Sequence, residues 1–199
     1  EITTRLVGSE MCIRDRSKAA VTAANNYKQG KVYKITPKSK PFKNKYVKAP
    51  TYNKKTRTYF TIRSYMEKFQ KAKKGTLVLK KGTYKITNTI QVPSNVTIIL
   101  EKGAKIVKSN QTGTKKMKAA TTIFQLIKPS NREKSNVYGG HNGEKNIHFV
   151  GKGSNVMDLK YLKANIAIVM GHNKDITVSG ITFQNVNTCL LYTSPSPRD

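Results

Sequence analysis

Alternating apolar and polar residues dominate the chain from Gly75 onward, with the period of two that is typical of β-strands. Gly, Asn, Ser or Pro separates the strand-like segments, which span residues 75–86, 95–107, 122–127, 146–156, 165–170 and 175–183. Corresponding apolar positions lie 21 to 29 residues apart: Leu77, Ile98, Phe124, Ile147 and Ile176. Repeats at this spacing predict an all-β solenoid, because each coil is too short to bury its own side chains and must share a core with its neighbours.

One helical pattern precedes the strands. Its apolar residues recur at helical spacing and form a single stripe: Ile62, Tyr65, Met66, Phe69 and Ala72. The stripe predicts an amphipathic helix over about residues 61–74. Ser64 and Glu67 have the spacing of a capping box, Thr61 is an alternative N-cap, and Gly75 suits the position after the helix. We expect this helix to cap the first coil, whose backbone groups and core would otherwise be open.

Asparagines occupy the ends of several predicted strands: Asn95, Asn146, Asn165 and Asn185. Two roles suit this position. Stacked amides can hydrogen-bond from one coil to the next, and asparagine is also an ordinary turn residue that tolerates left-handed backbone angles. The sequence leaves both roles open.

The two ends of the chain lack this pattern, and they explain each other at the level of DNA. Codons written for residues 189–199 encode LVGSEMCIRD when their reverse complement is read two bases out of phase, and this string is residues 6–15. The relation resembles a transposase-tagmentation sequencing adapter translated at both ends of a fragment. Residues 1–16 and 189–199 are therefore interpreted as non-native and set aside from the fold. A genuine disulfide between Cys12 and Cys189 is the alternative.

The segment from residue 17 to residue 57 contains no acidic residue and few aliphatic residues after Ile35. This composition predicts a basic linker or an extended strap, with 31–35 as a candidate short strand. Residues 58–188 are expected to hold the capping helix and the N-terminal coils. Without the adapter-like ends the chain has no cysteine, which leaves neither a disulfide framework nor a Cys-ligated metal site.

The net charge of the chain is +28. The adapter-like ends carry equal numbers of basic and acidic residues, so 34 Lys and Arg face only six carboxylates in the remainder. Such an excess favours polyanionic partners, such as acidic polysaccharide, wall teichoic acid, nucleic acid or an anionic membrane surface. A lysine-rich solvated surface is the alternative. Nucleic acid is not favoured, because the lysines are scattered rather than gathered on one helix, and no apolar run is long enough to span a membrane.

Three stretches carry a resemblance to a known family: GTLVLKKGTYKITNTIQVPSNVTIILEKGAKI, GEKNIHFVGKGSNVMD and AIVMGHNKDITVSGITFQNVN. They resemble the N-terminal coils of right-handed parallel β-helix proteins of the pectate-lyase superfamily type, over roughly residues 59–188. The resemblance implies a right-handed parallel β-helix, a secreted or cell-surface bacterial protein and a polysaccharide ligand, and calcium enters as a cofactor only by this resemblance. These sequence patterns are typical of how coils pack in this fold and do not identify catalytic residues.

Glycoside hydrolysis usually needs two carboxylates a few ångströms apart. The native part offers six: Glu67, Glu101, Glu133, Glu144, Asp158 and Asp175. The four glutamates are interpreted as turn or surface charges. Asp158 follows an apolar run in MDLK and Asp175 begins a strand, so these two form the best available pair. No catalytic residue is assigned.

Of the three histidines, His172 is the most suggestive, because it lies between Gly171 and Asn173 at a predicted coil corner. His141 lies in a glycine-rich loop. His148 alternates with inward-facing apolar residues and should point outward. No two histidines lie at ligand spacing on one element, so no metal site is expected. Asp158, His172 and Asn173 are the candidate substrate-binding residues.

Two functions remain open from the sequence. The first is a secreted β-helix protein that acts on an acidic polysaccharide, as a lyase or a hydrolase, with its main active-site coils beyond this fragment. The alternative is a non-catalytic cell-surface module that binds polyanionic wall polymers. A monomer is expected in both cases.

Overall fold

The computed structural model describes residues 24–134, 143–187 and 191–193. This part of the chain is mostly β, and its strands pair in parallel. Of the two adapter-like ends, only Leu191–Thr193 is described, as the short strand β13 that pairs with β10. Cys12 and Cys189, the alternative disulfide pair, lie outside the described residues.

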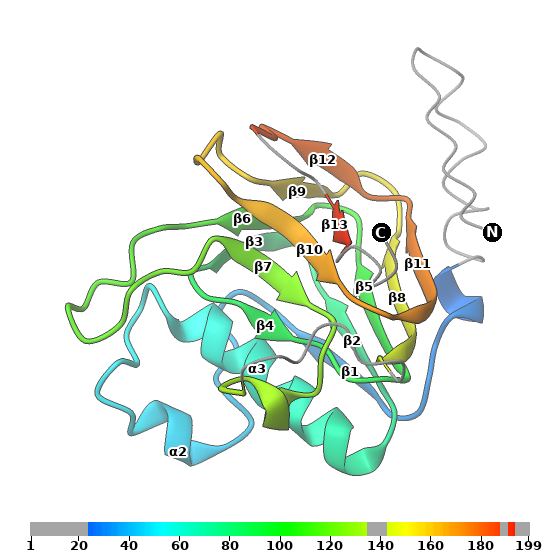
Figure 1. Cartoon of the computed structure of the whole chain (residues 1–199), viewed down its shortest axis with the longest axis horizontal. Helices are drawn as coiled ribbons and strands as arrows, with labels where there is room; N and C mark the ends of the chain where they lie inside the picture. Colours follow the sequence, from blue (N-terminus) through cyan, green and yellow to red (C-terminus); the bar gives the residue numbers. More distant parts are fainter. Residues whose placement is uncertain (1–23, 135–142, 188–190, 194–199) are drawn as a thin grey trace.

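Three parallel sheets make up the fold (Figure 1). The first sheet has the order β1-β2-β5-β8-β11, formed by Val32–Ile35, Gly75–Leu79, Val96–Leu100, Lys145–Gly151 and Lys174–Ser179. The second has the order β3-β6-β9-β12, formed by Gly82–Ile86, Ala104–Lys108, Val156–Asp158 and Thr182–Gln184. The third has the order β4-β7-β10-β13, formed by Ile90–Gln91, Thr122–Gln125, Ile166–Met170 and Leu191–Thr193. From β2 onward the chain visits the three sheets in turn, so each circuit adds one strand to each sheet.

The predicted strand segments are confirmed, and most of them split into two strands at a turn. Segment 75–86 becomes β2 and β3, and segment 95–107 becomes β5 and β6. Segment 122–127 contains β7 and segment 165–170 contains β10. The two-residue strand β4 was not predicted, because Ile90–Gln91 is too short to show an alternation.

The predicted equivalence of apolar positions is correct for two of the four neighbouring pairs, Leu77 with Ile98 and Ile147 with Ile176. Leu77 lies beside Ile98 in the first sheet, but the next residues in that column are Phe149 and Val178. Phe124 belongs to the third sheet, where it lies between Ile90 and Ile168.

Ile147 pairs with Val96 rather than with Ile98, and Ile176 pairs with Ile147. The column through Leu77 and Ile98 therefore advances by 21, then 51, then 29 residues. The long step contains the connections after β6 and β7, residues 109–121 and 126–144, which lengthen one circuit without adding a layer.

The three sheets share one core. Side chains from all three point inward and are completely buried: Leu77, Ile98 and Phe149 from the first sheet, Tyr84, Ile106 and Met157 from the second, and Ile90, Phe124 and Ile168 from the third. The rings of Phe124 and Phe149 lie 5.0 Å apart between their centroids, which joins the third sheet to the first. The all-β part of the prediction is confirmed, with parallel strands in all three sheets.

The helix α3 spans Arg57–Ala72, four residues earlier at its start than predicted. Ser64 and Glu67 therefore lie in its middle, and the predicted capping box is wrong. The Ser64 hydroxyl instead donates to the Thr61 carbonyl at 2.7 Å and accepts the Phe42 N–H at 2.8 Å. Neither Thr61 nor Gly75 caps the helix: Thr56 is the N-cap residue, and Lys73, whose φ is 62°, is the C-cap residue.

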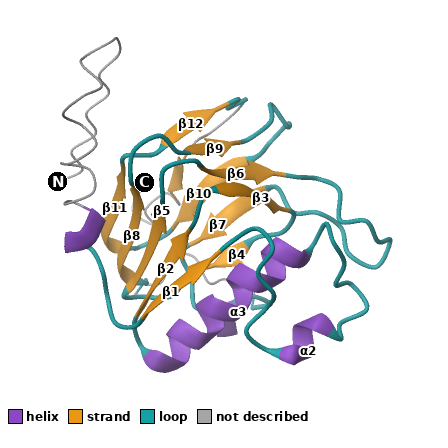
Figure 2. Ribbon diagram, turned by 180° about the vertical axis from the view of Figure 1, so that it is seen from behind, coloured by secondary structure: helices purple, strands orange, loops and turns teal. Residues whose placement is uncertain are grey.

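Gly75 is the first residue of β2 and allows close packing of α3 on the sheets. A Cβ at this position would lie 2.1 Å from Cδ1 of Phe69, so a larger residue would push the helix away. The apolar face of α3, which carries Ile62, Met66 and Phe69, packs toward β2, β3 and β4 (Figures 1 and 2). Since β3 and β4 are the edge strands of the second and third sheets, α3 covers the edges that these sheets would otherwise expose.

Residues 24–57, assigned from the sequence to a linker or strap, cross two regions of the fold. Val32–Ile35 forms β1 beside β2, as the candidate strand at 31–35 predicts. Ala24 and Tyr27 pack on the outer face of the first sheet, over Val78, Ile99 and Val150. The short helix α2, Asn44–Val47, then brings its buried residue Tyr46 toward α3.

The two roles left open for the strand-end asparagines occur together. Asn95 and Asn146 both have left-handed backbone angles, with φ of 59° and 57°. The Asn146 amide also donates to the Asn95 side-chain oxygen at 3.0 Å, between the neighbouring strands β5 and β8. These residues therefore turn the chain and link neighbouring strands.

Candidate functional site

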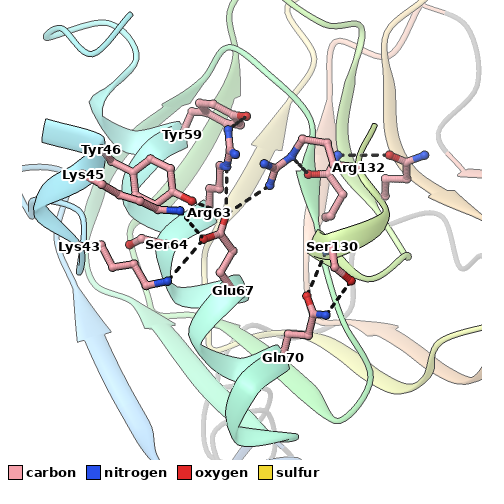
Figure 3. Close-up of polar contacts among 12 residues, drawn as sticks. Lys43, Lys45, Tyr46, Tyr59, Arg63, Ser64, Glu67, Gln70, Ser130 and Arg132 are labelled. Carbon is pink, nitrogen blue, oxygen red and sulfur yellow. Dashed lines mark hydrogen bonds and ion pairs between the residues drawn. The ribbon is translucent and has the colours of Figure 1, made fainter. Parts of the chain in front are cut away.

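An open pocket of about 360 Å³ lies between the α2 segment, α3 and the 3₁₀ helix η1, Pro129–Asn131. It is lined by Lys43, Lys45, Glu67, Gln70, Lys71, Pro129 and Ser130. Figure 3 shows five of these side chains, Lys43, Lys45, Glu67, Gln70 and Ser130, together with neighbouring polar residues. Segments that are far apart in the sequence therefore build one surface.

The helix α3 supplies the floor of this site. Glu67 follows Arg63 by four residues, and Gln70 and Lys71 follow Glu67 by three and four residues, so these side chains share one side of the helix, beside its buried apolar stripe. The Gln70 amide donates to Ser130 Oγ at 2.8 Å, and the Ser130 N–H donates to Gln70 Oε1 at 3.1 Å. This reciprocal pair fixes η1 to the helix.

Glu67 is surrounded by four cations. Arg63 Nε lies 3.3 Å from Oε1 and Arg132 Nη2 lies 3.7 Å from the same oxygen. Lys45 Nζ and Lys43 Nζ lie 3.7 Å and 3.8 Å from Oε2. The Glu67 side chain is 17% exposed, so these attractions are less screened than those of a fully solvated pair.

Two tyrosines complete the surroundings of Glu67. The Tyr46 hydroxyl donates to Glu67 Oε1, and Lys45 Nζ and the Arg63 guanidinium lie 4.8 Å and 5.1 Å from the centre of the Tyr46 ring. Burial, together with this hydrogen bond, raises the pKa of the Tyr46 phenol, and burial also raises the pKa of Tyr59. Both phenols therefore stay protonated and act as donors or ring partners rather than as bases.

Arg132 has unused hydrogen-bonding capacity. Its Nε donates to Gln91 Oε1 at 2.7 Å, which holds the side chain against β4. Its Nη2 is buried and has no hydrogen-bond acceptor within the described part of the chain, since Glu67 Oε1 at 3.7 Å is an ion-pair contact beyond hydrogen-bond range. The site thus has more donors and positive charge than Glu67 satisfies.

This arrangement suits the binding of an anion. Glycoside hydrolysis by two carboxylates is not built at this position, because Glu67 is the one carboxylate among the described residues that line the pocket. The surplus cations instead create a positive field at the opening, where an anionic group from solution can replace water.

Asp158, the first candidate from the sequence, lies at the end of β9 in the second sheet and is 1% exposed. Lys105 Nζ lies 3.1 Å from its Oδ2, while the Asn185 amide and the Lys160 N–H donate to its Oδ1 at 2.7 Å and 2.9 Å. Burial acts to raise its pKa, but these hydrogen bonds and Lys105 outweigh burial, and the pKa lies below its ordinary value. Asp158 is thus held as an anion inside a structural cluster.

His172 and Asn173 lie in the turn between β10 of the third sheet and β11 of the first sheet, whereas Asp158 lies in the second sheet. The Asn173 amide donates to the carbonyls of Leu126 and Glu144 at 3.1 Å and 2.8 Å, and its Oδ1 accepts the Gly171 N–H at 2.8 Å. These bonds tie the turn to the residue after β7 and the residue before β8. His172 has a φ of 50° in this same turn. The structure therefore does not bring the three candidates together.

Asp175, the proposed partner of Asp158, lies in β11 of the first sheet, whereas Asp158 lies in the second. His148 points to the outer side of the first sheet, as predicted, but it is covered by Tyr27, whose ring centroid lies 4.6 Å away. Burial lowers the pKa of His148. His141 lies outside the described residues.

The sequence did not single out the residues of the basic pocket. Lys43, Lys45 and Tyr46 fall in the segment assigned to a linker, and Glu67 was interpreted as a surface charge. The one local signal is the spacing of Arg63 and Glu67, which is that of an ion pair on one helix face. The other cations reach Glu67 only through the fold.

Among the described residues, no three His, Cys, Asp or Glu side chains are grouped so that they could hold a metal ion. No helix in this part of the chain is both long enough and apolar enough to cross a membrane. No protein-family model, curated protein or solved structure matches the chain.

Proposed function

We propose that this chain is the N-terminal part of a secreted bacterial right-handed parallel β-helix protein, and that it binds an acidic polysaccharide or an anionic cell-wall polymer. The three parallel sheets, visited in turn around one shared core, support the β-helix. The adapter-like residues at both ends are non-native additions in this proposal, and α3 is the cap of the first coil.

The observation that carries the binding function is the excess of cations over carboxylates. Over the whole chain 38 Lys and Arg face 10 Asp and Glu. The same excess recurs locally at Glu67, where four cations share one carboxylate at the edge of an open pocket. A polymer with a negative charge on each unit would be attracted along this surface and held by many weak contacts.

The proposal includes catalysis by the whole protein only because of the family resemblance. In proteins of that family the active-site residues generally lie in the middle coils. The described residues favour binding over lyase or hydrolase action, since their best-defined site presents cations around one carboxylate.

The test is calorimetric titration of the purified protein with polygalacturonate and with a poly(glycerol phosphate), at several salt concentrations. We expect saturable binding to at least one polymer, with an affinity that falls steeply as salt screens the contacts. Absence of binding to both polymers, or an affinity that does not change with salt, would refute the proposal. Unsaturated products from polygalacturonate, followed by ultraviolet absorbance with and without calcium, would instead assign a lyase.

A further inference from the structure

The basic pocket has donors that Glu67 does not use. The ammonium groups of Lys43 and Lys45 lie 3.8 Å and 3.7 Å from Glu67 Oε2, outside the range of a hydrogen bond. Lys71 lines the same pocket, and Arg132 Nη2 is buried without a hydrogen-bond acceptor among the described residues. A second anion therefore has three lysine side chains that line one opening, Lys43, Lys45 and Lys71.

The identity of these donors favours one class of anion. Carboxylates are best recognised by the planar fork of an arginine, and both arginines of the site are already turned toward Glu67. Arg63 is further committed through Nη1, which donates to the Tyr59 hydroxyl at 3.1 Å. The groups that remain at the opening are mostly lysine ammoniums, which act as compact point charges and serve well as phosphate ligands.

We infer that this pocket is a phosphate-binding site, in which Lys43, Lys45 and Lys71 hold the phosphate group of an anionic polymer beside Glu67. The inference rests on the proposed function, since it names the ligand class within the polyanions considered there. Glu67 then has a double role. It holds Arg63 and Arg132 in place, and its negative charge limits how tightly the phosphate binds.

The experiment uses inorganic phosphate as the probe, titrated calorimetrically into the full chain at low ionic strength. A pocket variant, Lys43→Gln with Lys45→Gln and Lys71→Gln, is compared with a control variant, Lys85→Gln with Lys163→Gln and Lys174→Gln. The control lysines are exposed and do not line the pocket, and replacing them removes the same net charge as the pocket variant does. We expect the pocket variant to lose affinity about tenfold or more, while the control stays close to the wild type.

A second variant tests the role assigned to Glu67. Glu67→Gln should bind phosphate more tightly than the wild type, because the competing carboxylate is gone while the three lysines remain. Weaker or unchanged binding in this variant would contradict the site. Thermal unfolding of each variant, monitored by circular dichroism, confirms that the compared proteins are folded.

The outcomes separate this inference from the proposed function. Equal losses in the pocket and control variants would overturn the site but leave general polyanion binding intact. Binding of polygalacturonate without any binding of phosphate or of poly(glycerol phosphate) would overturn the phosphate class alone. If neither polymer binds but phosphate still depends on the pocket lysines, the site stands and the proposed function fails.

Discussion

Replacing Glu67 with glutamine removes the one carboxylate that four cations share, with little change in shape. The glutamine side chain can still accept the Tyr46 hydrogen bond, but it no longer balances Lys43, Lys45, Arg63 and Arg132. We therefore expect a loss of stability that comes from charge rather than from packing.

The size of the loss follows from the contacts. Partly exposed ion pairs are each worth about 0.2–1 kcal/mol, and Lys45, with a side chain that is 61% exposed, belongs at the low end of that range. The Tyr46 hydrogen bond changes from a charged to a neutral acceptor, which costs about 1 kcal/mol more. The free energy of unfolding should therefore fall by about 3 kcal/mol.

Urea unfolding followed by circular dichroism measures this difference, at low salt and at about 1 M sodium chloride, where the Debye length is about 3 Å. The cost of the substitution should shrink at high salt, since both the lost attraction and the repulsion among the cations are screened. Glu133→Gln is the matched control, because Glu133 is exposed on the neighbouring loop and forms no ion pair among the described residues. A cost below about 0.5 kcal/mol, or one that salt does not change, would refute the role given to Glu67.

Three other substitutions test separate parts of the fold. Lys108 is 2% exposed, and burial lowers its pKa to about 8, so above that pH the unfolded chain binds more protons than the folded chain. The free energy of unfolding of the wild type, relative to that of Lys108→Met, should therefore rise by about 2 kcal/mol between about pH 7 and pH 9.5. The same comparison with the exposed control Lys85→Met should show no such rise. Asp158→Asn should lower the free energy of unfolding by about 2 kcal/mol at neutral pH. Because the pKa of Asp158 is lowered in the folded state, this difference should disappear as the pH falls through that lowered pKa. A difference that is constant with pH would contradict the role of Asp158 as a buried anion. Phe149→Ala should cost about 3–5 kcal/mol in urea unfolding, because the ring is completely buried against Phe124, and a cost near 1 kcal/mol would show that the two sheets do not share this core.

The sequence predicts those parts of the fold that are encoded locally. Alternation over four to six residues identifies the strands, because side chains of a strand point alternately to its two faces. The helical stripe identifies α3, although its start was misplaced, because Ser64 and Glu67 fit a capping box and yet lie in mid-helix. Capping patterns mark a helix end only when the residues before them are not helical.

The register between neighbouring strands of each sheet was harder to predict. The column from Leu77 to Ile98 follows from a regular spacing, but the next step to Phe149 spans two long connections. Connections between strands tolerate insertions at little cost in chain entropy, so spacing alone does not reveal their lengths.

The basic pocket depends on contacts across the fold. Lys43, Glu67 and Arg132 lie on three separate segments, and each one alone resembles an ordinary surface charge. Asp158 was singled out because it follows an apolar run, and Asn173 because it stands beside His172 at a predicted coil corner. Both residues form structural hydrogen bonds. Local pattern thus pointed to residues that hold turns, whereas the converging charges became visible only in the folded chain.

The account depends most on the stacking of successive circuits around one interior. Nuclear Overhauser contacts between methyl and aromatic protons test this stacking directly, along the first-sheet column Leu77, Ile98, Phe149 and Val178. Strand neighbours lie about 5 Å apart, so cross-peaks are expected for each successive pair and not between Leu77 and Val178. Cross-peaks that join Leu77 directly to Val178, or none between Ile98 and Phe149, would contradict the account.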